Sequence, residues 1–171
     1  MAMRGPETTA DEHPRPPAGS FAPDDPLRAD VIALLERHLD YAHANTAPQD
    51  VFALDVEGLK DPAITFFSYR DEAGALLAIG ALKHLDSSHV EIKSMHTAQA
   101  SRRRGIGRAM VAHLLDAARR DGYTRVSLET GSQPAFAPAR ALYEQAGFRP
   151  CGPFADYRGS PASAFMTIAL R

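Results

Sequence analysis

Cysteine is almost absent from this chain of 171 residues, in which Cys151 is the only one. A single cysteine excludes an internal disulfide and a metal cage built from cysteines. We interpret Cys151 as a small packing residue. The alternative is a nucleophilic Cys151 activated by one of the seven histidines, but no local motif supports it. We expect no bound metal.

Long apolar runs and a large excess of one charge are also missing. No stretch reaches the roughly 18 consecutive apolar residues that span a bilayer, and the N-terminus lacks the apolar core of a secretory signal. The formal net charge is -2 and the sequence pI is near 6.4, whereas a general nucleic-acid-binding protein usually has a clear basic excess. We therefore expect a cytoplasmic protein that binds neither membranes nor nucleic acids.

The first 26 residues differ in composition from the rest of the chain. They contain six prolines and hardly any apolar residue apart from Phe21. Low apolar content cannot offset the entropy of ordering a chain, and proline interrupts helices and central strands. We predict that residues 1–26 are disordered. Residues 27–171 are predicted to form one domain, because a chain of this length with 44% apolar residues supports one core.

Helical and strand patterns alternate along residues 27–171. The pair Asp25-Pro26 has the chemistry of a helix start, and residues 44–61 are predicted to be a loop with one helical turn near 51–55. The patterns predict helices at 27–43, 107–120 and 138–145, and strands at 63–70, 75–82, 90–97, 124–130, 148–151 and 165–170. Because strand-helix-strand crossovers are right-handed, strands 90–97 and 124–130 should be parallel neighbours beside antiparallel ones. The fold class is therefore α+β.

The loop before the second predicted helix is the main candidate for a binding site. Glycines let a ligand approach the backbone, and the N–H groups at a helix start attract anionic oxygens. We interpret this loop as a pyrophosphate site. The alternatives are an ordinary loop, because Gly-x-Gly alone is a weak signal, and a dinucleotide-binding turn, which needs a third glycine where Met110 stands. The loop reads Arg102-Arg103-Arg104-Gly105-Ile106-Gly107-Arg108.

A later run reads Ala141-Leu142-Tyr143-Glu144-Gln145-Ala146-Gly147-Phe148. Together with the loop at 102–108, this run resembles the GNAT superfamily of N-acyltransferases. The run 91–95 (Glu-Ile-Lys-Ser-Met) and the segment 154–158 look like a bacterial subgroup, the YsnE-like acetyltransferases. The resemblance implies a mixed central sheet flanked by helices, with antiparallel N-terminal strands and a splayed parallel pair in the middle. It also implies acetyl-CoA as the cosubstrate. The expected contacts are the backbone of Met95, His96 and Thr97 with the pantetheine arm, and Arg102, Arg103, Arg104, Gly105, Ile106, Gly107 and Arg108 around the pyrophosphate.

The resemblance further implies direct acetyl transfer to an amine within a ternary complex. Tyr143 falls on the family's tyrosine, which protonates the leaving thiolate, and Glu91 lies where some members place a general base. The alternatives are a Tyr143 that only packs on the core and a Glu91 that is a solvated carboxylate at a strand edge. Two features of the family are not matched. Phe136 stands where an asparagine is common, and the usual first strand cannot be placed.

The acceptor substrate is the part of the reaction that the sequence specifies least. Lys93, Tyr157 and Arg158 are candidates to hold an acceptor carboxylate, and plain surface charge is their alternative role. Glu129 and Asp156 would instead favour a cationic amine. We expect a small-molecule amine as the acceptor, and a homodimer is compatible with the family. The two alternative functions are a non-catalytic acyl-CoA-binding module and a protein N-terminal or lysine acetyltransferase.

Overall fold

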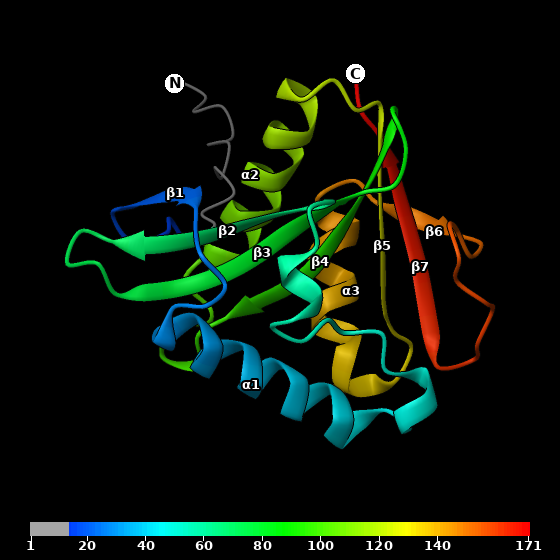
Figure 1. Ribbon diagram of the computed structural model, residues 1–171, viewed down its shortest axis with the longest axis horizontal. Helices are drawn as coiled ribbons and strands as arrows, with labels where there is room; N and C mark the ends of the chain where they lie inside the picture. The colour runs from blue at the N-terminus through cyan, green and yellow to red at the C-terminus, as the bar shows by residue number, and fades with distance from the viewer. Residues whose placement is uncertain (1–13) are drawn as a thin grey trace, which may run out of the picture.

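Seven strands form one mixed sheet in the order β1-β2-β3-β4-β5-β7-β6 in the computed structural model, which describes residues 14–171 (Figure 1). Strands β1 to β4 pair antiparallel, β4 and β5 pair parallel, and β7 pairs antiparallel with β5 and β6. The predicted α+β class, with its parallel pair in the middle, is confirmed. The elements are β1 (Gly19–Pro23), α1 (Ala29–Asn45), β2 (Ile64–Asp71), β3 (Leu76–His84), β4 (His89–Thr97), α2 (Ile106–Arg120), β5 (Arg125–Gly131), α3 (Ala137–Gln145), β6 (Arg149–Cys151) and β7 (Ser163–Ala169).

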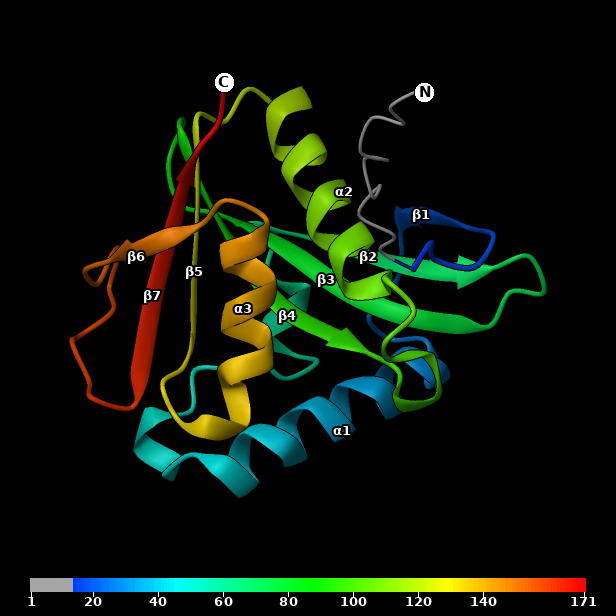
Figure 2. The ribbon, with the colours of Figure 1, turned by 180° about the vertical axis from the view of Figure 1, so that it is seen from behind.

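Helices cover both faces of the sheet. Helix α1 lies on one face, and α2 and α3 lie on the other (Figures 1 and 2). Each helix turns an apolar stripe toward the sheet. The core beneath α1 contains Val31, Leu34, Leu35, Phe66, Ile79 and Ala81. The larger core beneath α2 and α3 contains Val90, Ile92, Met110, Val111, Leu114, Val126, Leu128 and Phe148.

The two central strands separate toward their C-terminal ends. A bulge gives β4 one residue more than β3 around Ser94, whose φ is 54°. The pairing of β4 with β5 ends at Ile92 and Leu128. Both strands continue beyond these residues, β4 to Thr97 and β5 to Gly131. The bulge bends β4 away from its neighbour, so the expected splayed pair is present and the sheet is open between the two strand ends.

Strand β1 lies inside the segment that the composition predicts to be disordered. That prediction is wrong for residues 19–23, which pair with β2. The ring of Phe21 stacks on Tyr69 at 4.2 Å and on His113 at 4.6 Å between ring centres. Backbone pairing and one aromatic side chain thus hold a segment that has little apolar content of its own. β1 is also the first strand that the sequence could not place, and residues 1–13 lie outside the described residues.

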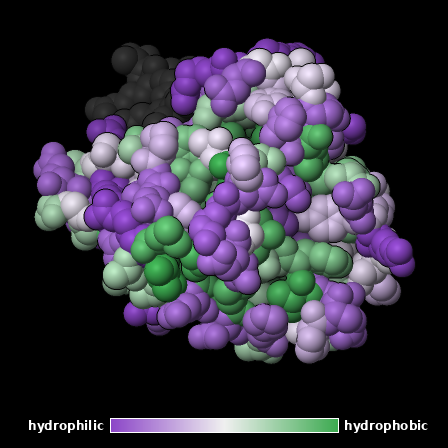
Figure 3. Space-filling view, viewed as in Figure 1, coloured by the Kyte–Doolittle hydropathy of each residue, from purple (hydrophilic) through white to green (hydrophobic). Residues whose placement is uncertain are grey.

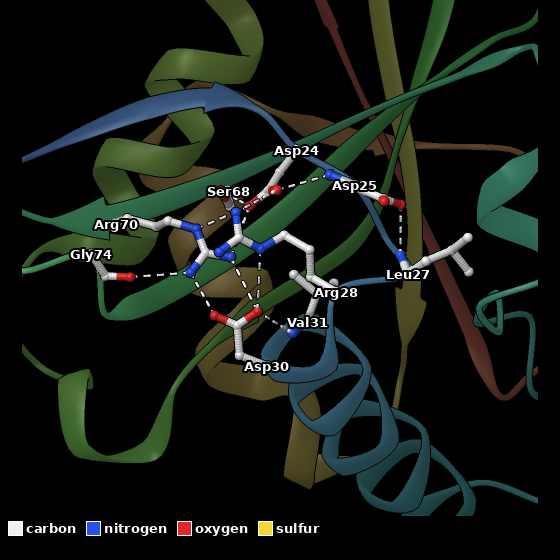
Figure 4. Close-up of polar contacts among 9 residues, drawn as sticks. All are labelled: Asp24, Asp25, Leu27, Arg28, Asp30, Val31, Ser68, Arg70 and Gly74. Carbon is white, nitrogen blue, oxygen red and sulfur yellow. Dashed lines mark hydrogen bonds and ion pairs between the residues drawn. The ribbon is translucent and has the colours of Figure 1, made fainter.

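Ion pairs join the segment after β1 to β2 (Figure 4). The Arg70 guanidinium on β2 bonds to Asp24 at 2.9 Å and to Asp30 at 2.5 Å, and the Ser68 hydroxyl donates to Asp24 at 2.6 Å. Burial alone would raise the pKa of Asp24, but the hydrogen bonds from Ser68 and Arg70 outweigh it and hold this pKa below its ordinary value. This network fixes the path from β1 into α1.

The start of the first helix and the position of the short helical turn differ from the predictions. Helix α1 begins at Ala29 rather than at residue 27, because the Asp25 carboxylate accepts the N–H of Leu27 at 2.8 Å in a turn that precedes the helix. The helical turn predicted near 51–55 is also wrong. Short 3-10 turns occur instead at Pro48–Asp50, which proline opens, and at Gly58–Lys60.

The surface that carries α1 is mostly hydrophilic, with apolar residues gathered in patches in the lower half of the view (Figure 3). Within residues 14–171, the large apolar side chains that are exposed are Leu27 and Tyr41. No helix in this part of the chain is both long enough and apolar enough to cross a membrane.

Candidate active site

A cavity of about 710 Å³ lies where β4 and β5 diverge. Its walls come from the ends of both strands, from α1, from the first turn of α2 and from α3. The arginine-glycine loop that precedes α2 and the side chain of Tyr143 on α3 line the same space. The fold therefore brings together the two sequence runs that were singled out separately.

The start of α2 can receive an anion through its backbone. Gly105 is the residue before the helix, with φ of 74°, and no side chain caps the first turn. The first N–H groups are therefore available to a ligand, and the helix dipole favours negative charge there. A Cβ at Gly107 would lie 3.3 Å from Leu142 Cδ2, so a side chain here would fill the cradle. Ile106 is buried in the core, so only its backbone can reach a ligand.

Most of the residues expected to bind the cosubstrate line the cavity. Arg102, Arg103 and Arg108 bring positive charge to its wall, whereas Arg104 is exposed and is not among the lining residues. Backbone N–H groups, glycines and arginines suit a pyrophosphate, so the residues present fit this part of acyl-CoA. The expected lining residues on β4, namely Met95, His96 and Thr97, are also part of the wall.

Tyr143 projects from α3 into the cavity wall. The side chain is buried and packs against Phe148, with 5.7 Å between ring centres. Burial raises the pKa of the Tyr143 phenol well above its ordinary value, and the negative charge of Glu129 adds to the effect. The hydroxyl therefore stays protonated at neutral pH and can donate a proton or a hydrogen bond.

Glu129 lies on β5 just beyond the last residue that pairs with β4, and it lines the cavity. Burial raises the pKa of its carboxyl above the ordinary value, and the nearby charge of Glu91 acts in the same direction. The positive charge of Lys93 opposes this rise. A carboxylate with a raised pKa beside a cavity is suited to taking a proton.

Glu91 and Lys93 form a buried cluster with Tyr157. The Tyr157 hydroxyl donates to the Glu91 carboxylate, which is 2% exposed. The Lys93 ammonium lies 3.4 Å from the same carboxylate, 2.7 Å from the Tyr157 hydroxyl and 3.1 Å from the carbonyl oxygen of Phe52. Lys93 lines the cavity, but Glu91 and Tyr157 are not among the lining residues. Arg158 is exposed and is not brought to the cavity.

A histidine pair on the cavity wall was not found from the sequence. His38 on α1 and His96 on β4 have their Nδ1 atoms 3.3 Å apart. Burial lowers the pKa of both imidazoles to about 4, and the charge of Lys93 contributes for His38. Both rings are therefore neutral at pH 7. The available signal was that His38 follows Leu35 by three residues, which places it on the core-facing side of the helix.

The unmatched Phe136 also lies on the cavity wall. It packs edge-to-face on Tyr41, with 5.6 Å between ring centres. A Cβ at Gly131 would overlap the Phe136 ring, which explains the glycine at the end of β5. An aromatic ring thus stands on the cavity wall at the sequence position where the family often has an asparagine.

Comparisons with known proteins identify the family of the chain. Residues 30–148 match the Acetyltransferase (GNAT) family. The chain is 44% identical over 147 residues to the uncharacterized N-acetyltransferase YsnE of Bacillus subtilis (strain 168), covering 86% of this chain and 97% of that protein. It is 42% identical over 147 residues to the uncharacterized N-acetyltransferase YedL of Escherichia coli (strain K12), covering 86% and 92%.

Solved structures share the fold. A proposed acyl-CoA N-acyltransferase from Klebsiella pneumoniae aligns with a TM-score of 0.76 and 24% identity, covering 90% of this chain and 98% of that one. A GNAT family acetyltransferase from Elizabethkingia anophelis, which has acetyl-CoA bound, aligns with a TM-score of 0.62 and 15% identity, covering 89% and 98%. From its family match and its curated relatives, the chain belongs to the GNAT family of acetyltransferases and is an acyltransferase enzyme.

Proposed function

We propose that this enzyme transfers the acetyl group of acetyl-CoA directly to the amine of a small metabolite within a ternary complex. The observation that carries the proposal is one continuous cavity that extends from the loop at the start of α2 to Tyr143 and Glu129. A cosubstrate held along this cavity would have its thioester beside a proton donor and a carboxylate base. No covalent acyl-enzyme is needed.

The chain's own groups would hold and orient the cosubstrate, which supplies the activated acetyl group when bound. The first N–H groups of α2, with the charges of Arg102 and Arg103, hold the pyrophosphate. The backbone of residues 95–97 no longer pairs with β5, so it can pair with the pantetheine arm like an added strand. A backbone N–H of the same stretch polarises the thioester carbonyl.

Two side chains would move protons in the reaction. The Glu129 carboxylate takes the proton that the acceptor ammonium loses, and the freed amine attacks the thioester carbon. As the carbon–sulfur bond breaks, the Tyr143 hydroxyl gives its proton to the departing thiolate. The attacking nitrogen loses its second proton to the Tyr143 phenolate, which becomes the phenol again, and Glu129 releases its proton to solvent. The raised pKa of Glu129 supports its role as a base, and the raised pKa of Tyr143 keeps the phenol protonated until the thiolate departs.

Glu91 was the base predicted from the sequence, and that role stays a prediction. We favour Glu129 for direct proton removal because its side chain lines the cavity, whereas Glu91 accepts a hydrogen bond from Tyr157 and is not part of the wall. Glu91 would then act through Lys93, as the counter-charge that holds the ammonium in place.

The acceptor is proposed to be an amine rather than a molecule selected by its carboxylate. The Lys93 ammonium donates to the Phe52 carbonyl and to the Tyr157 hydroxyl, and it is paired with the Glu91 carboxylate at 3.4 Å. Its charge is therefore already balanced by Glu91, which weakens its attraction for an acceptor carboxylate. The remaining carboxylate on the wall, Glu129, suits an ammonium group.

Calorimetric titration with acetyl-CoA, run beside a thiol-release screen of amines, tests this function. We expect acetyl-CoA to bind, and CoA thiol to be released with one amine class. We also expect a loss of about 10²-fold or more in turnover in Tyr143→Phe. Binding without turnover for any small amine would favour the non-catalytic module, and turnover only on peptide N-termini or lysines would favour the protein-modifying enzyme. The homodimer and the cytoplasmic location stay predictions.

A further inference from the structure

Residues 14–18, the chain segment that leads into β1, pass directly beside the loop at the start of α2. A Cβ at Gly105 would overlap the carbonyl oxygen of Pro14 and lie 3.7 Å from Cδ of Pro16. Pro14 also lines the cavity. We propose that residues 14–18 form a strap that braces the phosphate-binding loop and completes its wall. The proposal rests on the proposed function, because it concerns the site assigned to acetyl-CoA.

The strap is attached to two different layers of the fold. The Tyr69 hydroxyl on β2 donates to the carbonyl oxygen of Pro17. Four residues later, Phe21 lies between the ring of Tyr69 and the ring of His113 on α2. The strap is thus fixed to β2 at Pro17, next to the contact of Phe21 with α2, and at its other end Pro14 lies against Gly105 at the start of α2. It can transmit the position of β2 to the first turn of the helix.

The loop that it contacts has a backbone that needs support. Arg103 has φ of 59° and Gly105 has φ of 74°, so two residues of the loop adopt the left-handed conformation within three positions. For arginine this conformation is unfavourable by roughly 1–2 kcal/mol, and such backbones persist only where neighbouring groups hold them. The N–H groups of the first turn face the ligand only while the loop keeps this shape.

The composition of the strap suits a brace. Pro14, Pro16 and Pro17 have restricted φ angles, so ordering them costs less entropy than ordering other residues. Proline has no N–H group, so Pro14 presents only its carbonyl oxygen to Gly105. Pro16 and Pro17 are half-buried, which is consistent with packing on the fold rather than extension into solvent.

The test compares ligands that do and do not reach the loop, using the full-length protein. Calorimetry measures the dissociation constants of CoA and of S-acetylpantetheine, which lacks the pyrophosphate. The variants are Tyr69→Phe, which removes the hydroxyl that holds Pro17, and Pro16→Gly, which loosens the strap. The matched control is Tyr123→Phe, which removes a tyrosine hydroxyl bonded to His84 at 2.8 Å on another part of the surface.

We expect CoA to bind about fivefold more weakly in Tyr69→Phe, the effect of one hydrogen bond between neutral groups. In Pro16→Gly we expect binding to weaken by about two- to fivefold, the effect of the added chain entropy. The affinity for S-acetylpantetheine should not change, and the control should match the wild type for both ligands. Unchanged CoA affinity in both strap variants would overturn the brace. Tighter CoA binding in the strap variants would also overturn it, because the strap would then hinder binding. Equal weakening for CoA and S-acetylpantetheine would overturn it as well, because the variants would then disturb the whole site and not the phosphate-binding loop. A wild-type protein that does not bind CoA would overturn the proposed function itself.

Discussion

Replacing Glu129 by glutamine separates the two carboxylates that could take the proton from the acceptor. The substitution keeps the size of the side chain and removes its ability to accept a full proton. Glu129 lines the cavity, and Glu91 lies behind the hydroxyl of Tyr157. We therefore expect the main catalytic loss in Glu129→Gln rather than in Glu91→Gln.

The expected loss of turnover in Glu129→Gln follows from the rate acceleration that a general base provides. A positioned base accelerates a reaction by about 10² to 10⁴, which corresponds to about 2.7 to 5.4 kcal/mol of barrier. The loss should shrink at alkaline pH, where more of the acceptor arrives as the free amine. Burial raises the pKa of Glu129 above 4.5, so the wild-type kcat/KM should fall on the acid side of that raised value. In Glu129→Gln this acid limb should be absent.

The matched control is Glu91→Gln, whose effect should fall on stability. Lys93 would lose the counter-charge 3.4 Å away while its ammonium stays 9% exposed, and an uncompensated buried charge costs about 3–5 kcal/mol. A melting temperature lowered by roughly 10 °C is expected for a chain of this size. Thiol release per folded molecule, measured from about pH 4.5 to 9, provides the comparison. Loss of activity in folded Glu91→Gln with near-normal activity in Glu129→Gln would refute the assignment.

Three further predictions concern the loop before α2, the ion pair of Asp24 with Arg70, and the histidine pair. Gly107→Glu should abolish CoA binding in calorimetry, because a carboxylate would occupy the anion cradle beside Leu142; retained affinity would contradict that location. Asp24→Asn should lower the unfolding free energy at pH 7 by about 1–2 kcal/mol. Because the pKa of Asp24 is lowered in the fold, its charge stabilises the fold above pH 3.8, and this stabilisation is lost as pH falls further. Urea melts should therefore show the difference in unfolding free energy between wild type and Asp24→Asn shrinking by pH 3; a constant difference would refute the role of this charge. The two imidazoles have a pKa of about 4 in the fold against 6.5 in the unfolded chain, so the wild type should lose stability as pH falls from 6.5 to 4, on the order of 1–3 kcal/mol for each. His38→Gln should flatten this dependence in thermal melts, and an unchanged slope would contradict the pairing with His96.

The parts of the fold that the sequence predicted are those specified by local chemistry. Helices α2 and α3 carry clear apolar stripes, and the glycines at 105 and 107 mark the loop between β4 and α2. The crossover rule then placed β5 beside β4. Tyr143 was located for the same reason, because it stands within a short contiguous run near the end of α3.

The parts that were missed depend on contacts between distant residues. β1 has few apolar residues and is ordered by pairing with β2 and by Phe21 against His113. The burial of Glu91 depends on Tyr157, which comes from the segment between β6 and β7, 66 positions later in the chain. His38 approaches His96 only after α1 has packed on the sheet. No local sequence pattern specifies these contacts, because tertiary packing determines which residues come together.

The most direct test of the central claim is a two-substrate kinetic measurement of CoA thiol release, with the responding amine and acetyl-CoA both varied. We predict intersecting patterns typical of a ternary complex, an acetylated amine formed in equal amount to the thiol, and no acetylated form of the protein by intact mass. Parallel patterns with an acetylated protein intermediate would contradict direct transfer. Acetyl-CoA binding without thiol release for any amine would contradict catalysis in this cavity.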